Sequence, residues 1–126
     1  MMRSKIDKTI SIVLLLILMI PVILTDKPKL LPFFFGDTIN LVQNITFSIS
    51  CSLISGSEPI FFEWFHNGNR LEERSNLRIE NLNDRGSLLS FSFIQIDDAG
   101  KYECKARNQF GLSSISTNLI VKGLNI

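Results

Sequence analysis

Few side chains in this 126-residue sequence could carry out chemistry. His66 is the only histidine, and Asp97 and Asp98 form an adjacent carboxylate pair. A histidine acts as a catalytic base beside a nucleophile, and none has a natural place next to His66, so we expect a solvated or partly packed ring. The sequence also contains no glycine-rich phosphate loop and no Gly-x-Ser-x-Gly motif. These patterns predict that the protein is not an enzyme.

The first 25 residues differ in composition from the rest of the chain. Three basic residues lie among the first eight, and an uncharged run of mostly Ile, Leu, Val and Met follows from 9 to 25. This pattern is typical of a secretory signal peptide. The alternative is an uncleaved signal anchor, because the run approaches the ~18–20 residues that span a bilayer. We therefore expect residues 26–126 to form one domain that is secreted, or held at the cell surface if residues 1–25 are retained. In either case Cys51 and Cys104, the only cysteines, meet an oxidising compartment.

Charge excludes other classes of partner. Without residues 1–25, 10 of the 13 basic and 11 of the 12 acidic residues remain, a formal net charge of −1. No basic patch emerges, so no nucleic-acid partner is expected. No small-molecule substrate is expected either, and contact with a membrane is expected only through an N-terminal anchor.

Short strands must position the candidate residues. From Ile39 to Leu53, apolar residues occupy almost every odd position and small polar residues lie between them. This alternation predicts one half-buried antiparallel strand with Cys51 facing inward. Alternate residues from Asp98 to Ala106 predict another strand, with Cys104 on the face that this set shares. Gly100 allows a tight turn before that strand.

A further strand is predicted from Ile60 to His66, and it ends at an Asn-Gly turn. If Trp64 faces the core, Phe61 and Phe65 lie outside, and Phe93 is also out of phase with the core positions. Exposed aromatic residues commonly mark protein contacts, so Phe61, Phe65 and Phe93 form the candidate contact surface. The alternative is that loops or a neighbouring domain cover these rings.

The whole pattern predicts an all-β fold. Seven or more short strands follow one another at regular spacing, with no helical periodicity after residue 25. Such a pattern favours an antiparallel β-sandwich, with helix confined to the N-terminal segment.

Four residues connect this sequence to a known family. Trp64 follows Cys51 by thirteen positions, and Tyr102 precedes Cys104 by two. This arrangement resembles an immunoglobulin domain. The segments DDAGKYEC and ARNQFG, with a cysteine separation of 53, resemble its intermediate (I-set) type. The segments LPFFFGD, SGSEPI, FEWFHNGNRL and LRIENLNDRGSLLSF are similar to domains of the arthropod Down syndrome cell adhesion molecule (Dscam) family. Members of that family carry many such domains and a membrane span.

The resemblance implies an inter-sheet disulfide between Cys51 and Cys104, with two free thiols as the alternative. It also implies that Trp64 packs against this bridge. A metal site needs several cysteine, histidine or carboxylate ligands that converge. With both cysteines committed to the bridge, no metal and no cofactor is expected.

The resemblance also implies a tyrosine corner, in which the hydroxyl of Tyr102 bonds back to the backbone near Asp97–Asp98. The two aspartates are then the turn before this corner rather than a catalytic pair. Together with Gly100 and Tyr102, Asp98 belongs to the structural signature of the fold. Its carboxylate is expected to pair with an arginine of the preceding strands, Arg74 or Arg78.

The implied function is recognition of another protein. The chain would be a non-enzymatic recognition or cell-adhesion module that binds a homophilic or heterophilic partner outside the cell. The alternative is a structural spacer, one domain of a larger multi-domain cell-surface or matrix protein.

One modification signal is present. Asn44-Ile45-Thr46 is the only Asn-x-Ser/Thr triplet with a permitted middle residue. Because Asn44 is out of phase with the apolar positions that follow it, we expect its side chain to face solvent and to carry an N-linked glycan.

Overall fold

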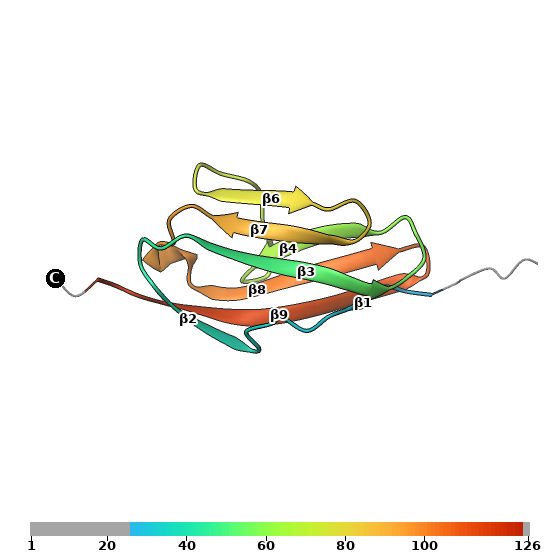
Figure 1. The fold of residues 1–126 in the computed structure, drawn as a ribbon, viewed down its shortest axis with the longest axis horizontal. Coiled ribbons are helices and arrows are strands. Elements are labelled where there is room, and N and C mark those ends of the chain that lie inside the picture. Colours follow the sequence, from blue (N-terminus) through green and yellow to red (C-terminus); the bar gives the residue numbers. More distant parts are fainter. Residues whose placement is uncertain (1–25, 125–126) are drawn as a thin grey trace, which may run out of the picture.

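Two β-sheets pack face to face in this protein. The computed structural model describes residues 26–124, so the predicted signal peptide or anchor, residues 1–25, lies outside the described part. The four-stranded sheet has the order β1 (Lys29–Leu30), β3 (Phe47–Ser55), β7 (Gly86–Phe91) and β6 (Leu77–Asn81). The five-stranded sheet has the order β2 (Thr38–Val42), β9 (Gly111–Lys122), β8 (Gly100–Asn108), β4 (Phe61–His66) and β5 (Asn69–Arg70). The strands of both sheets run along the long axis of the molecule (Figure 1), which confirms the predicted all-β sandwich.

The strand predicted from Ile39 to Leu53 is in fact two strands in different sheets. β2 pairs with β9, and this is the parallel pair in an otherwise antiparallel fold, whereas β3 pairs with β1 and β7. The chain turns at Asn44, whose φ is 72°. The prediction of one strand is therefore wrong, although the alternation was real, because Ile39 and Ile49 face one shared core from opposite sheets.

A short 3-10 helix, η1 (Ile96–Asp98), lies between β7 and β8. The prediction that helix is confined to the N-terminal segment misses this element, because three residues are too few to produce a helical repeat. A capping box stabilises it: the carboxylate of Asp98 accepts a hydrogen bond of 2.7 Å from the backbone N–H of Gln95.

The predicted Asn-Gly turn after β4 is confirmed. Asn67 and Gly68 both have positive φ, 50° and 84°. Two such residues form the tight turn whose twist suits a β-hairpin, and asparagine and glycine adopt this conformation at low cost. The turn joins β4 to β5 at the edge of the five-stranded sheet.

A disulfide ties the two sheets together through the core. Cys51 of β3 is bonded to Cys104 of β8, and neither residue is exposed to solvent. This finding confirms the implied bridge and excludes the alternative of free thiols. Trp64 lies opposite Cys104 in the β4–β8 ladder and is 1% exposed, and the ring of Phe33 stacks on it with centroids 6.0 Å apart. The hydrophobic core also contains Leu30, Ile39, Ile49, Ile60, Phe62, Leu77, Leu89, Phe91, Ile94, Tyr102, Ala106 and Leu119.

No helix within residues 26–124 is long and apolar enough to cross a membrane.

Candidate functional site

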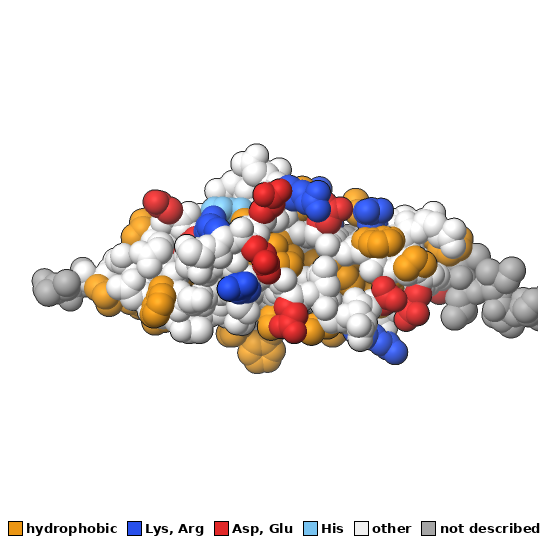
Figure 2. Space-filling view, turned by 90° about the horizontal axis from the view of Figure 1, so that it is seen from above, with side chains coloured by type: hydrophobic (Ala, Val, Ile, Leu, Met, Phe, Trp, Pro, Cys, Tyr) orange, Lys and Arg blue, Asp and Glu red, His pale blue; other side chains and the backbone are white. Residues whose placement is uncertain are grey.

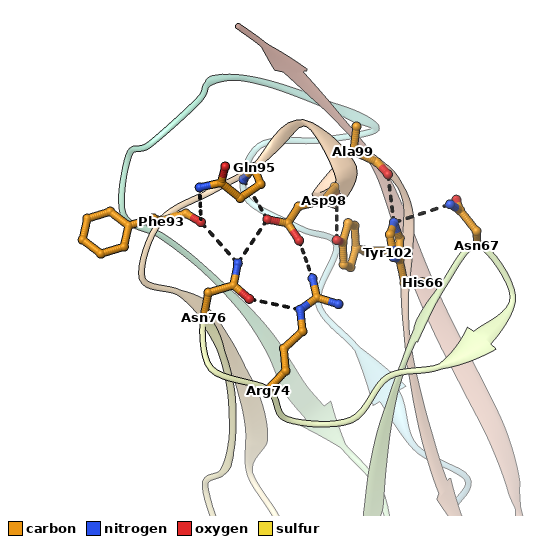
Figure 3. A network of polar contacts seen from close by, with 9 residues as sticks. All are labelled: His66, Asn67, Arg74, Asn76, Phe93, Gln95, Asp98, Ala99 and Tyr102. Carbon is orange, nitrogen blue, oxygen red and sulfur yellow. Dashed lines mark hydrogen bonds and ion pairs between the residues drawn. The ribbon is translucent and has the colours of Figure 1, made fainter. Parts of the chain in front are cut away.

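Asp98 is the centre of a polar network at the start of β8 (Figure 3). It is 2% exposed, and its carboxylate contacts the guanidinium of Arg74 and lies 3.4 Å from the side-chain nitrogen of Asn76. Of the two arginines that the sequence offered, the structure pairs Arg74 with this carboxylate. The network joins the segment before β6, a strand of the four-stranded sheet, to the segment before β8, a strand of the five-stranded sheet. It therefore links the two sheets at this end of the domain.

Tyr102 forms the predicted tyrosine corner. Its hydroxyl donates a hydrogen bond of 2.6 Å to the backbone carbonyl of Asp98. Burial raises the pKa of this phenol well above its usual range, and the carboxylate of Asp98 raises it further, whereas Arg74 acts in the opposite direction. The phenol therefore stays protonated, and remains a donor, at alkaline pH where an exposed tyrosine ionises.

His66 is a packing residue in this arrangement. Its ring stacks on Tyr102 with centroids 4.4 Å apart, and its Nε2 donates a hydrogen bond of 2.8 Å to the carbonyl of Ala99. The imidazole and the buried carboxylate thus make structural contacts (Figure 3). Within residues 26–124, no group of three or more histidine, cysteine, aspartate or glutamate side chains converges to hold a metal ion.

Sequence reasoning missed Ser87, which accepts the hydrogen bond of the buried indole of Trp64. The indole N–H of Trp64 donates a hydrogen bond of 2.9 Å to Oγ of Ser87, and this serine is fully buried. Its position on β7 between core residues marks it only weakly, because serine is common at exposed strand positions in this chain.

The outward face of the five-stranded sheet combines aromatic and charged side chains. On β4, Phe61, Glu63 and Phe65 point outward, and on β8 the neighbouring outward residues include Lys105 and Arg107. The Lys105 ammonium lies 4.4 Å from the centroid of the Phe65 ring, and the Arg107 guanidinium lies 4.9 Å from that of Phe61. We call this surface the aromatic–charged face, defined by Phe61, Glu63, Phe65, Arg70, Glu103, Lys105 and Arg107.

Ion pairs connect the charges on this face. Glu63 lies 3.6 Å from Arg70 and 3.5 Å from Arg107, and Glu103 lies 3.7 Å from Lys105. These pairs are partly exposed and contribute little to stability individually. They do hold the cations over the two rings, so the face presents a pre-arranged set of rings and charges.

The structure brings together two of the three predicted contact residues. Phe61 is 51% exposed and Phe65 is partly buried, and both belong to the aromatic–charged face. Phe93 is 59% exposed but lies in the segment between β7 and η1, and its ring points away from the polar network (Figure 3). Phe93 therefore belongs to a different part of the surface.

A second apolar surface lies beside the four-stranded sheet. The segment between β1 and β2 buries Phe33 but leaves Phe34 95% and Phe35 53% exposed. These two rings border a shallow hollow whose other walls include Ser48 and Leu88. Elsewhere, acidic and basic side chains are interspersed with single apolar ones, as Figure 2 shows for the face seen from above Figure 1.

Comparison with known proteins gives a consistent result. The model of the immunoglobulin I-set domain matches residues 37–121. Human pro-neuregulin-2, membrane-bound isoform, is 30% identical over 79 residues, which are 62% of this chain and 9% of that protein. Junctional adhesion molecule A of Felis catus is 34% identical over 70 residues, which are 51% of this chain and 24% of that protein. The chain thus spans about a tenth of the length of the pro-neuregulin-2 relatives that it matches.

Solved structures show the same likeness. The Dscam1 Ig7 domain, isoform 5, superimposes with a TM-score of 0.69 at 26% identity, covering 76% of this chain and 97% of that one. An I-band fragment of titin has a TM-score of 0.69 at 23% identity, covering 78% of this chain and 33% of the fragment, and so shares the fold. The resemblance to Dscam domains that the sequence predicted is therefore confirmed.

Proposed function

The chain belongs to the immunoglobulin I-set family, and from this premise we propose that it is a non-enzymatic protein-recognition module of a secreted or cell-surface protein. We propose that the aromatic–charged face contacts the partner. The observation that carries this proposal is the pairing of two outward-pointing phenylalanine rings with cations on the outer face of one sheet.

The composition of this face suits a protein partner. Aromatic residues and arginine are enriched in protein interfaces, and the energy of binding is concentrated in a few such residues. Phe61 offers an exposed ring, and the guanidinium of Arg107 lies over it while its Nε donates a hydrogen bond of 3.5 Å to Glu63. Both side chains project from positions that pair with each other on β4 and β8 rather than from a loop, so little backbone entropy is lost when a partner binds.

The relatives support the same class of function. Junctional adhesion molecule A is an adhesion molecule by name. The similarity to the Dscam1 Ig7 domain covers 97% of that domain and 76% of this chain. Fold alone does not determine function, so the proposal rests on the face and takes the relatives as support.

The experiment is a binding assay with the full chain secreted from an animal cell. Beads coated with the protein are tested for aggregation with one another and for binding to a panel of cells. Aggregation indicates a homophilic partner and cell binding a heterophilic one. Phe61→Ser combined with Arg107→Glu should weaken the observed binding about 30-fold, the effect of losing about 2 kcal/mol at a hot spot.

Phe34→Ser is the matched control, because Phe34 is more exposed than Phe61 but lies outside the five-stranded sheet. Equal weakening by the control and the double variant would contradict the proposed face. A double variant that binds like the unaltered protein would contradict it as well.

A structural spacer is the second candidate. The large size of the relatives favours it, since this chain corresponds to 9% of human pro-neuregulin-2. A transcript that continues past codon 126 into further immunoglobulin domains, together with no binding by the isolated domain, would support the spacer and reject the recognition module.

A further inference from the structure

We propose that Asn44 carries an N-linked glycan, and that this glycan covers an apolar strip close to Lys122, the last residue of β9. The strip consists of Ile45, Phe93 and Ile96. Asn44-Ile45-Thr46 is the only Asn-x-Ser/Thr acceptor triplet of the chain, and such triplets are modified on the surface of secreted proteins.

The turn between β2 and β3 presents the acceptor nitrogen to solvent. Asn44 is exposed, and its backbone N–H donates a hydrogen bond of 2.7 Å to the carbonyl of Ile94. Its side-chain Oδ1 accepts one of 3.1 Å from Nε2 of Gln95. Its Nδ2, the atom to which a sugar is attached, donates no hydrogen bond within the described part of the chain.

Asn108 shows the contrast. Nδ2 of Asn108 donates to the carbonyls of Asp26 at 2.7 Å and Ser57 at 2.9 Å. A substituent on that nitrogen would break contacts that fasten the start of the described chain. At Asn44 the substituted amide keeps its oxygen, so the bond from Gln95 is retained and the turn is undisturbed.

The backbone that carries the three residues of the strip lies next to this acceptor. The backbone N–H of Ile94 donates a hydrogen bond of 2.9 Å to the carbonyl of Ile45, which places residues 93–96 beside the acceptor triplet. Ile45 is 40%, Phe93 59% and Ile96 46% exposed. Sugar rings have apolar C–H faces, and packing them on these side chains removes apolar surface from water.

The proposed glycan leaves the aromatic–charged face free. In the five-stranded sheet, Val42 pairs with Lys122, whereas Arg107 pairs with Leu112. Ten residues of β9 separate these levels, which is about 33 Å at about 3.3 Å per residue. The face also includes Glu103, which pairs with Ser116, and six residues of β9, about 20 Å, separate that level from Lys122. A glycan at Asn44 and a partner on the aromatic–charged face therefore occupy different parts of the domain, and either proposal can fail without the other.

The first test is the mass of the full chain secreted from an animal cell. We expect a glycan mass that peptide-N-glycosidase F removes, leaving aspartate at position 44 in the peptide spectrum. Asn44→Gln and Thr46→Ala should both abolish the added mass. Thr46→Ser is the matched control that preserves the acceptor triplet, and it should keep the glycan. Protein made in this host without a glycan at position 44 would overturn the proposal.

The second test measures whether the glycan covers the strip. Enzymatic removal of the glycan from the folded protein should increase the fluorescence of a dye that binds exposed apolar surface. Phe93→Ser should reduce that increase, whereas Phe34→Ser, which alters an exposed ring elsewhere, should leave it unchanged. Equal dye binding before and after deglycosylation would show that the glycan does not cover the strip.

Discussion

Replacing Ser87 with alanine tests whether the buried tryptophan depends on its single polar partner. The indole N–H of Trp64 donates to Ser87 over 2.9 Å, and the two residues are 1% and 0% exposed. Alanine removes the acceptor and fits the same space. Because water has no access to this position, the N–H is left without a partner in the core.

The expected cost follows from this burial. A buried donor that loses its partner destabilises a protein by about 1–3 kcal/mol. This is a large share of the stability of one small domain, typically about 5–15 kcal/mol. In a domain of this size the melting temperature should fall by about 4–8 °C for each kcal/mol lost.

Urea unfolding followed by far-ultraviolet circular dichroism measures this effect. Ser48→Ala is the matched control, because Ser48 is exposed on β3 and its hydroxyl donates a hydrogen bond to the hydroxyl of Ser90. The control should change the free energy of unfolding by less than about 0.5 kcal/mol. In a Trp64→Phe background, which lacks the donor, Ser87→Ala should cost clearly less than in the unaltered protein. An equal cost in both backgrounds, or a cost no larger than that of the control, would refute the reasoning.

Three further predictions concern the polar network and the disulfide. Arg74→Met should lower the free energy of unfolding by about 1–3 kcal/mol, because it removes the charged partner of a buried carboxylate. Arg78→Met, at an exposed position, should change it by less than about 0.5 kcal/mol. Chemical denaturation compares the two variants, and equal effects would contradict the assigned pair. Tyr102 is the only tyrosine, so phenolate absorbance reports it alone. Because its pKa is raised, the Tyr102 phenol of the folded protein stays protonated at about pH 10, where the phenol of the unfolded chain ionises. The stability that this difference contributes is fully present below about pH 10 and is lost as the pH rises further. Ionisation of the folded protein's tyrosine at the pH of the unfolded chain would contradict this prediction. Replacing both Cys51 and Cys104 with alanine opens a loop with a sequence separation of 53, and the chain-entropy relation gives a loss of about 4 kcal/mol, measurable by thermal unfolding; a variant as stable as the parent would reject that account.

The strand pattern illustrates how far local periodicity reaches. The alternation from Ile39 to Leu53 correctly identified residues that face the core, but not that β2 and β3 belong to different sheets. The odd-numbered residues point into the core in both strands, so the alternation continues across the turn although the chain passes from one sheet to the other. The partner of β2 is β9, about eighty residues away, and no local pattern encodes that pairing.

The candidate surfaces show the same division. The phase of Phe61 and Phe65 relative to Trp64 predicted their outward direction, because a strand has a period of two. That Lys105 and Arg107 cover those rings depends on the register of β4 against β8. Phe93 shared the same phase argument, but the segment after β7 is irregular and carries it to another part of the surface.

The sequence by itself determined the family, the disulfide, the tyrosine corner and the absence of an evident catalytic motif. The disulfide and the corner follow from the family resemblance, which rests on residue types at fixed spacings, such as Trp64 thirteen residues after Cys51 and Tyr102 two residues before Cys104. Only the tertiary structure decided that Arg74 rather than Arg78 pairs with Asp98, and that Ser87 serves the buried indole. Each of these contacts joins residues from separate strands or loops, and their distance is set by how the two sheets pack.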